Sequence, residues 1–240
     1  MTYPLLPTVL LLFCSLFFKD IVPTDIKEKK PIYHATNNIS TTVSAEEMVY
    51  NNLESNDLPM PSRESFMVAF KGFTKLKAKG LITKNILTLV DFSLSSNSKR
   101  LWVIDLDSNV VLFNTLVAHG RNTGQEFASS FSNVSESFKS SLGFYATGEI
   151  YTGKHGASLK LDGLEKGINS NARERAVVIH GADYVSDSFI RNNKRLGRSL
   201  GCPAIPVELT DKIIKTIKDK SCLFIYYPSS NYTVASRLFS

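Results

Sequence analysis

The feature that most constrains the fold is a succession of short apolar runs between residues 86 and 180. They are rich in β-branched and aromatic residues, and polar turns separate them; they cover residues 86–92, 101–106, 110–118, 144–151 and 176–180. Runs of this length and composition predict strands rather than helices. The Asp-Ser-Asn turn at 107–109 predicts a hairpin between the second run and the third. We therefore expect a mostly β domain.

Helical signals occur before and after these strands. Ser44, with Glu47 three residues later, forms a possible capping box and predicts a short helix to residue 53. Ser62 can cap a second helix, whose apolar residues recur at helical spacing until Gly80 ends it. Pro206 opens an amphipathic helix, and an apolar strand follows at 221–227. We expect a helical extension over 44–82 and a catalytic domain over 83–240.

The N-terminal segment is apolar from residue 5 to residue 18 and is followed by a Lys-Asp pair. A transmembrane helix needs ~20 apolar residues, so we expect residues 1–20 to be a signal peptide or an N-terminal anchor. Membrane attachment would then run through this segment. Lipid attachment at Cys14 is the weaker alternative, because the bulky Phe13 precedes it. Residues 21–43 are polar and lack an apolar period, which predicts a tether.

Charge and cysteine content narrow the class of protein. The net charge of +6 favours acidic surfaces or carboxylate-bearing substrates. Nucleic acid is not an expected partner, because the basic residues form no long cluster and no binding motif. Beyond the N-terminal segment only Cys202 and Cys222 remain, too few for a disulfide framework. Cys222 lies in an apolar run, so a buried thiol is favoured over a bridge to Cys202.

Two segments carry the chemistry: Val-Ile-His-Gly at 178–181 and Ser-Leu-Gly-Cys-Pro at 199–203. The thiolate is the reactive form of cysteine, so a nucleophilic Cys202 needs a base such as His180 within hydrogen-bond reach. Gly201 removes a side chain beside the sulfur, where backbone N–H groups can face a developing oxyanion. The two segments therefore indicate cysteine acyl transfer.

With His-Gly followed by Ser-x-Gly-Cys near the end of a β-rich domain, the chain resembles the L,D-transpeptidase (YkuD-type) catalytic domain of bacterial cell-wall enzymes. The resemblance covers roughly residues 87–227. The segment Ser-Leu-Gly-Phe-Tyr at 141–145 is similar to a Thr-Pro-x-Gly-x-Phe segment of that family. The resemblance implies a β-sandwich or barrel with a few helices. It also implies a place in the bacterial cell envelope, periplasmic or membrane-anchored.

The resemblance also implies a reaction. Cys202 would attack the carbonyl of the third residue of a peptidoglycan stem peptide, release the terminal D-alanine, and pass the acyl group to an amine. His180 would be the general base, and the carbonyl of Gly181 would orient its imidazole, in place of the carboxylate of other triads. No cofactor is implied.

The loop before the nucleophile would form the oxyanion hole. The resemblance assigns this role to backbone N–H groups of residues 200–202, including Leu200 and Gly201, and gives the Ser199 hydroxyl a supporting role. Family members usually carry a histidine where this chain has Leu200, and a polar residue soon after the cysteine, where this chain has Pro-Ala. These departures indicate a divergent branch, and they bear on the choice of acceptor and on the rate more than on the nucleophile itself.

Further residues could bind substrate. Arg198 lies in a basic stretch that could hold stem-peptide carboxylates, Tyr184 could line the cleft, and His119 could end a strand beside it. The alternative for each is an ordinary solvated or packed side chain. A metal site joining His119, His155 and His180 to Cys202 is a weaker alternative, because these separations lack the short paired spacing of zinc ligands. We expect no metal.

Two other functions remain open from the residues. Water could replace the amine acceptor, which would make the protein an L,D-carboxypeptidase or amidase. A catalytically inactive wall-binding module is the alternative from a different class, and Leu200 in the motif favours it. The enzyme interpretations predict a depressed pKa for the Cys202 thiol, whereas the binding module does not.

Overall fold

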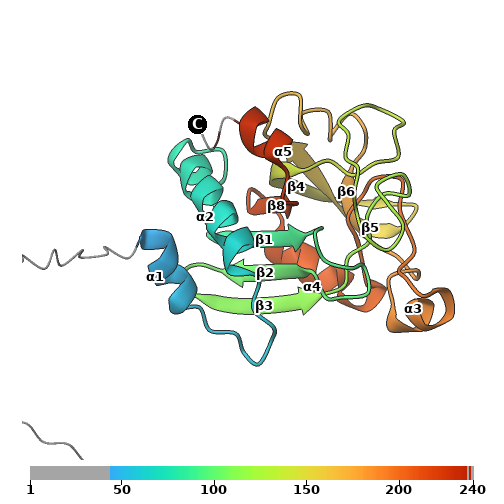
Figure 1. The fold of residues 1–240 in the computed structure, drawn as a ribbon, viewed down its shortest axis with the longest axis horizontal. Coiled ribbons are helices and arrows are strands. Elements are labelled where there is room, and N and C mark those ends of the chain that lie inside the picture. Colours follow the sequence, from blue (N-terminus) through green and yellow to red (C-terminus); the bar gives the residue numbers. More distant parts are fainter. Residues whose placement is uncertain (1–43, 237, 239–240) are drawn as a thin grey trace, which may run out of the picture. The chain divides into compact units, whose positions relative to one another are not determined.

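The computed structural model of the protein describes residues 44–236 and 238 (Figure 1). The predictions for 1–20 and 21–43 concern residues outside this range. The helices are α1 (Ala45–Asn51), α2 (Arg63–Ala78), α3 (Asp187–Asn193), α4 (Val207–Ile217) and α5 (Ser230–Ala235). The strands are β1 (Ile86–Asp91), β2 (Leu101–Asp105), β3 (Val110–Thr115), β4 (Gly143–Gly153), β5 (Gly156–Gly163), β6 (Val178–Gly181), β7 (Ala204–Ile205) and β8 (Cys222–Tyr226).

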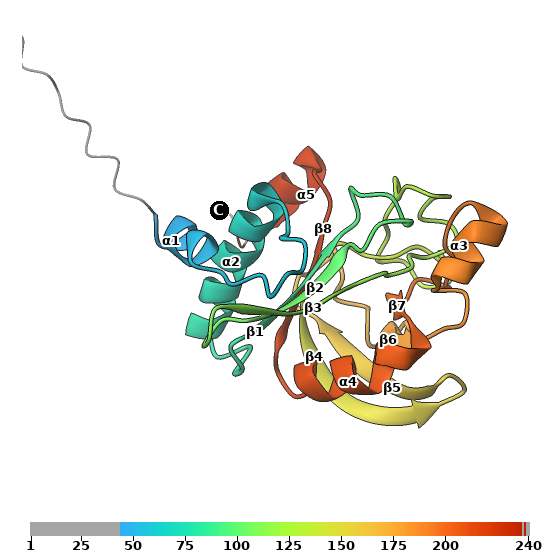
Figure 2. The same ribbon diagram turned by 90° about the horizontal axis from the view of Figure 1, so that it is seen from below.

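The strands form one sheet in the order β3-β2-β1-β8-β4-β5-β6-β7, in which only the pairs β1–β8 and β6–β7 are parallel (Figure 2). Beyond β3, the chain turns back to the opposite edge: Ala118 bridges Ala204 and Gly120 bridges Ser199. The sheet is therefore nearly closed, and the prediction of a mostly β fold with a few helices is confirmed. The seam of this closure lies beside the segment that holds Cys202.

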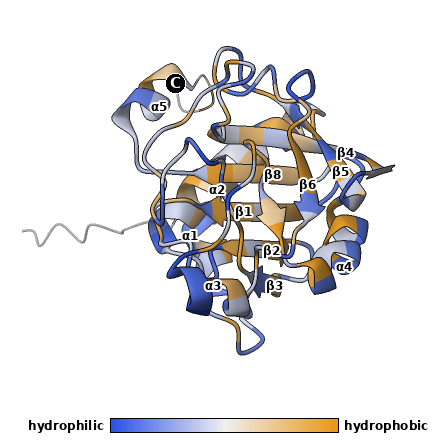
Figure 3. Ribbon diagram, turned by 90° about the vertical axis from the view of Figure 1, so that its right-hand side faces the viewer, coloured by the Kyte–Doolittle hydropathy of each residue, from blue (hydrophilic) through white to orange (hydrophobic). Residues whose placement is uncertain are grey.

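Helix α2 shares its core with the sheet. Phe66 and Phe73 of α2 are buried in the same cluster as Leu89 of β1 and Phe224 of β8. Burying one such side chain contributes roughly 1.5–3 kcal/mol. Figure 3 shows the hydrophobic residues gathered on the strands, whereas α3 is largely hydrophilic. The described residues all fall in one compact unit, so the helices of 44–82 belong to the same body as the sheet.

Helix α4 fixes the end of β6. Its buried residues are Thr210, Ile213, Ile214 and Ile217. A Cβ atom at Gly181 would come within 2.5 Å of the Thr210 hydroxyl oxygen, so glycine is what allows the helix to pack this closely. The helix predicted after Pro206 is thereby confirmed, and its packing holds the residue next to His180.

Most of the predicted elements are present. The runs at 86–92, 101–106, 110–118, 144–151 and 176–180 correspond to β1, β2, β3, β4 and β6. The Ser44 hydroxyl caps α1 by accepting from the N–H of Glu47, 3.2 Å away. The reciprocal half of the capping box is wrong, because the Glu47 carboxylate pairs with Arg63 instead. Strand β5 was not predicted, since Gly, Ser, Lys and Asp interrupt its apolar residues. Helix α3 was not predicted because it is short and its only apolar residues are Phe189 and Ile190, too few to show a helical period.

Candidate active site

His180 is the penultimate residue of β6, and one of its ring nitrogens is engaged. Its Nδ1 lies 2.9 Å from the carbonyl oxygen of Gly181, which can only accept, so Nδ1 carries the proton. Nε2 is then the nitrogen able to accept a proton. Burial lowers the pKa of His180; the Gly181 hydrogen bond raises it, and the nearby charges of His155 and Lys154 lower it further. The imidazole is therefore neutral at neutral pH, and Gly181 holds its orientation.

Cys202 is partly exposed and lies in the loop before β7. Its sulfur is 3.5 Å from the backbone nitrogen of Val178 and 3.7 Å from the carbonyl oxygen of Ala176. Burial raises the pKa of the thiol, and this outweighs the lowering by the Val178 N–H, Arg175 and Lys154. The prediction of a depressed Cys202 pKa is wrong for the free protein: the resting site pairs a thiol with a neutral imidazole.

His180 and Cys202 line the same cavity, whose volume is about 640 Å³. It is lined by Tyr151, Gly153, Lys154, His155, Ser158, Arg175, Ala176, Val178, His180, Tyr184, Arg198, Ser199, Leu200 and Cys202. Lys154, Arg175 and Arg198 give the lining three basic side chains, and none of the residues that line the cavity is an aspartate or a glutamate. A cavity of this charge favours an anionic ligand.

Two hydrogen bonds of the Ser199 hydroxyl stabilise the loop that carries Cys202. Its hydroxyl donates to the carbonyl oxygen of Cys202 at 2.6 Å and accepts from the N–H of Gly201 at 3.0 Å. The supporting contact implied for Ser199 is thus present. The Gly201 N–H is engaged by this hydroxyl rather than left for an oxyanion. Among the described residues, the N–H groups of Leu200 and Cys202 have no protein partner, so these two are the available donors.

Gly201 is required by its conformation and by its neighbours. Its φ is +128°, which L side chains rarely adopt, and a Cβ atom would lie 3.0 Å from the carbonyl oxygen of Lys139. The Ser140 hydroxyl donates to the Gly201 carbonyl at 3.0 Å. Arg175 holds the same neighbouring segment, donating to the carbonyl oxygens of Ser132 at 2.8 Å and Lys139 at 2.7 Å. Contacts with Ser140 and with the segment that Arg175 holds therefore fix the loop that carries Cys202.

Tyr184 and Arg198, two residues predicted to bind substrate, both line the cavity. Arg198 Nη1 donates to the carbonyl oxygens of Arg121 at 2.9 Å and Gly124 at 3.0 Å. These contacts hold one side of its guanidinium and leave the other nitrogens for a ligand. Leu200 is 55% exposed at the mouth of the cavity.

His119, the third predicted substrate residue, is 1% exposed and does not line the cavity. Its Nδ1 accepts from Arg100 at 2.9 Å, and its Nε2 lies 3.3 Å from the carbonyl oxygen of Gly124. Burial, and then the charge of Arg100, lower the pKa of His119 to about 4. The prediction of substrate contact is corrected: His119 is a core residue that supports the loop through its backbone, since its carbonyl accepts from the N–H of Ser199 at 3.0 Å.

A family model for the L,D-transpeptidase catalytic domain matches residues 59–226. The chain belongs to this family. The match spans the sheet, α2 and both motif segments, so the resemblance inferred from the motifs is confirmed. No curated protein matches the chain.

Solved L,D-transpeptidases are among the structures similar to this chain. One from Mycobacterium smegmatis is 10% identical, with a TM-score of 0.37, over 60% of this chain and 59% of its own length. One from Mycobacterium tuberculosis is 10% identical, with a TM-score of 0.35, over 60% of this chain and 58% of that one. One from Enterococcus faecium is 11% identical, with a TM-score of 0.35, over 60% of this chain and 50% of that one. The matched part thus spans less than two thirds of each of these proteins.

Several cavity residues of this L,D-transpeptidase domain were not predicted from the sequence. Tyr151, Lys154 and His155 come from the β4–β5 hairpin, and Arg175 comes from the segment before β6. The three hairpin residues are separated from the motifs along the chain, whereas Arg175 lies close to the first motif but belongs to no recognisable pattern. The available signal was the His-Gly dipeptide at 155–156, which repeats the dipeptide at 180–181. Its place against His180 depends on strand pairing.

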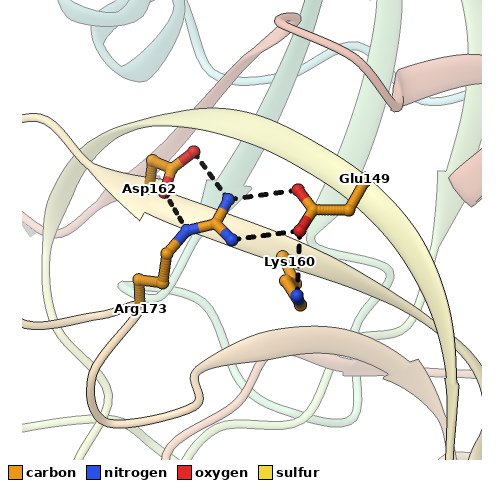
Figure 4. Close-up of polar contacts among 4 residues, drawn as sticks. All are labelled: Glu149, Lys160, Asp162 and Arg173. Atoms are coloured by element: carbon orange, nitrogen blue, oxygen red, sulfur yellow. Dashed lines mark hydrogen bonds and ion pairs between the residues drawn. The ribbon is translucent and has the colours of Figure 1, made fainter.

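An exposed ion-pair network joins the β4–β5 hairpin to the segment before β6 (Figure 4). Arg173 bridges the carboxylates of Glu149 on β4 and Asp162 on β5, and Lys160 lies 2.8 Å from Glu149. Hydrogen bonds from Arg173 and then Lys160 hold the pKa of Glu149 well below its usual range. Exposed ion pairs contribute little stability individually. The forked geometry nevertheless fixes the segment leading to Arg175 against the hairpin.

In the part of the chain that the structure describes, no helix is both long and apolar enough to cross a bilayer. Over the same residues, no three His, Cys, Asp or Glu side chains come together as metal ligands would. His119, one of the residues considered for a metal, is instead engaged by Arg100. Cys202 and Cys222 are both free thiols, and Cys222 is fully buried in β8.

Proposed function

We propose that the protein is a cell-wall L,D-transpeptidase in which Cys202 forms a thioester with a peptidoglycan stem peptide. The observation that carries the proposal is that Cys202 and His180 line one basic cavity, with Nδ1 of the imidazole bound to Gly181 and Nε2 left as the proton acceptor. This is the arrangement that activates a cysteine by an adjacent base.

In the first half-reaction, the Cys202 sulfur attacks the carbonyl carbon of the third stem residue while His180 Nε2 takes the thiol proton. The carbonyl electron pair moves to oxygen, and the N–H groups of Leu200 and Cys202 stabilise that charge. When the carbonyl re-forms, the C–N bond to D-alanine breaks, and His180 returns the proton to the leaving amine. Because the resting thiol is protonated, proton removal accompanies attack rather than preceding it.

In the second half-reaction, an amine of a neighbouring stem peptide attacks the thioester carbonyl. His180 takes the amine proton, the C–S bond breaks, and the proton returns to the sulfur. The covalent step thus divides one acyl transfer into two easier ones. The total charge and the number of protons on the site are restored, and no cofactor is consumed.

The cavity charge favours this substrate class. Stem peptides carry carboxylates, and Lys154, Arg175 and Arg198 line the cavity without an acidic neighbour among its lining residues. Arg198 has guanidinium nitrogens free to pair with a carboxylate, and Tyr184 lines the same cavity. A substrate outside the cytoplasm fits an envelope location reached through residues 1–20, as a signal peptide or a membrane anchor.

Acylation by a carbapenem, a strained acyl donor, tests the proposal. We expect intact mass to show one adduct on the full chain and none on Cys202→Ala. Cys222 is an internal control, since a fully buried thiol should stay unmodified in both proteins. A wild-type protein without an adduct, or an adduct that persists in Cys202→Ala, would contradict the assignment of the nucleophile.

Wild type and its Cys202→Ala and His180→Ala variants also test the two alternative functions. The raised pKa of Cys202 favours an inactive wall-binding module. Such a module would form no adduct, and its wild-type, Cys202→Ala and His180→Ala forms would all bind isolated cell wall equally well. A carboxypeptidase would form the adduct but convert a tetrapeptide stem to a tripeptide without cross-linking it. Mass analysis of stem peptides incubated with an amine acceptor distinguishes this product from the cross-linked dimer.

A further inference from the structure

The tip of the β4–β5 hairpin places a second imidazole against the catalytic candidate. Gly153 pairs with Gly156, so Lys154 and His155 form a two-residue turn. The His155 ring stacks on the His180 ring, with centroids 4.4 Å apart and 22° between the planes. His155 is exposed on its other side and lines the cavity. It thus covers one face of the ring that must accept the thiol proton.

Strand pairing, rather than a flexible loop, brings the two rings together. Ser158 of β5 pairs with His180 of β6, and the hairpin turn lies three residues before Ser158. Gly156 has a φ of +74°, which lets the turn close in two residues. The position of the His155 backbone is therefore defined by the register of β5 on β6, and the contact follows from the fold.

We propose that His155 is a positioning residue for His180, whose stacked ring holds the imidazole in the orientation where Nδ1 donates to Gly181 and Nε2 is left for the thiol proton. The proposal rests on the proposed function, because it assigns a role within the same reaction. Stacked aromatic rings restrict each other's rotation and shield each other from water. His155 supplies an imidazole to a site in which Leu200 occupies the motif position of the second histidine.

The stack also sets the charge around His180. Several charged or titratable groups line the cavity with it: Tyr151, Lys154 and His155 from the hairpin, Arg175 from the segment before β6, Tyr184, and Arg198 and Cys202 from the loop before β7. Of these, His155 has its ring in direct contact with His180. A proton on one ring opposes a proton on the other, so His155 biases His180 toward the neutral form that acts as the base.

Three variants of the full chain separate the stack from the charge. His155→Ala removes both the ring and its titratable nitrogens, whereas His155→Phe keeps a ring and removes the nitrogens. Thr152→Ala is the matched control, because Thr152 is exposed on the same hairpin and does not line the cavity. The His180 imidazole of each protein is titrated by NMR from about pH 5 to 8, and carbapenem acylation of Cys202 is timed by intact mass over the same range.

We expect the pKa of His180 to rise in both His155 variants, and more in His155→Ala, which also uncovers the ring. The acid limb of acylation should move to higher pH with it. His155→Ala should acylate roughly tenfold more slowly at neutral pH, a fraction of the 10²–10⁴ that a general base supplies. The acylation rate of His155→Phe above the acid limb should stay near the wild-type plateau. Thr152→Ala should match wild type in both measurements.

The proposal is overturned if the His180 titration and the acylation profile of both His155 variants coincide with those of Thr152→Ala. Should His155→Ala fail to fold, His155→Phe still decides, because loss of the neighbouring charge must move the His180 titration. The NMR titration does not depend on activity. A wild-type protein that forms no adduct would therefore defeat the proposed function and leave the His155–His180 coupling to be judged on its own.

Discussion

His119 and His180 occupy opposite sides of the nucleophile loop, and each is followed by glycine. Both are buried, at 1% and 3% exposure, and burial lowers the pKa of each. Their tautomers are opposite. His119 Nδ1 accepts from Arg100, so its proton is on Nε2, whereas His180 Nδ1 donates to Gly181. The same dipeptide in the same kind of environment therefore has two chemical states, set by one neighbour each.

The difference shows what distinguishes a base from a core histidine. Both nitrogens of His119 are engaged, one by Arg100 and one by Gly124. His180 has one nitrogen engaged and lines a cavity with Cys202. Burial and a lowered pKa are common to both residues and so do not identify the base. The spare nitrogen at the cavity is the feature that supports the proposal of His180 as the base.

The largest expected effect separates the two histidines in catalysis. His180→Ala should slow carbapenem acylation of Cys202 by roughly 10²–10⁴, because a general base contributes about that much. His119→Gln keeps an acceptor for Arg100 and a donor for Gly124, so its folded molecules should acylate at close to the wild-type rate. Timed intact-mass measurements give both rates. Equal losses in the two variants would abolish the distinction drawn between them.

A second prediction concerns stability, where His119 rather than His180 is expected to have the large effect. The pKa of His119 is about 4 when folded and 6.5 as its ordinary value, so the unfolded chain binds the proton first. The contribution of neutral His119 to the free energy of unfolding is complete above pH 6.5 and is lost as pH falls toward 4. This loss is about 3 kcal/mol, at roughly 1.4 kcal/mol per pH unit. Wild type should therefore lose about that much more stability than His119→Gln over this window.

Denaturant unfolding at several pH values measures the difference. Comparing wild type with His119→Gln cancels the contributions of other titrating groups, among them Asp91 and Glu165, whose pKa values are raised by burial. Parallel stability curves for the two proteins would mean that His119 is not held neutral by the core.

Much of the fold and part of the site follow from local sequence. Strand runs, helix caps and the Pro206 helix are local patterns, and the motifs place His180 and Cys202 because each motif also encodes its own backbone contacts. The parallel pairing of β1 with β8 joins residues 87 and 222, and no local pattern encodes it.

The unpredicted part of the site depends on burial and on register. His119 was expected at the cleft because a histidine at a strand end is polar; only the buried Arg100, 0% exposed, explains its place in the core. The Cys202 pKa was expected to be low because an imidazole is near, yet burial dominates. His155 reaches His180 through the β5–β6 register, which a turn signal alone cannot give.

The smallest expected effect tests how firmly the third His-Gly dipeptide, at His155, is held. Glu149→Gln removes the β4 partner of Arg173 and Lys160, while Arg173 keeps Asp162. Glu174→Gln is the matched control, an exposed acid of the same segment with no ion pair among the described residues. Glu149→Gln should lower the melting temperature slightly more than the control, and the difference should vanish in about 1 M salt, where charges are screened within ~3 Å.

Its effect on Cys202 acylation should be smaller than that of His155→Ala, since the β5–β6 register still positions the hairpin. Timed intact-mass measurement on the three variants gives the order. If Glu149→Gln slows acylation as much as His155→Ala, the ion-pair network, rather than the strand register, must hold the ring against His180. The contrast between the two buried histidines would then depend on a surface feature, and high salt alone should weaken the base.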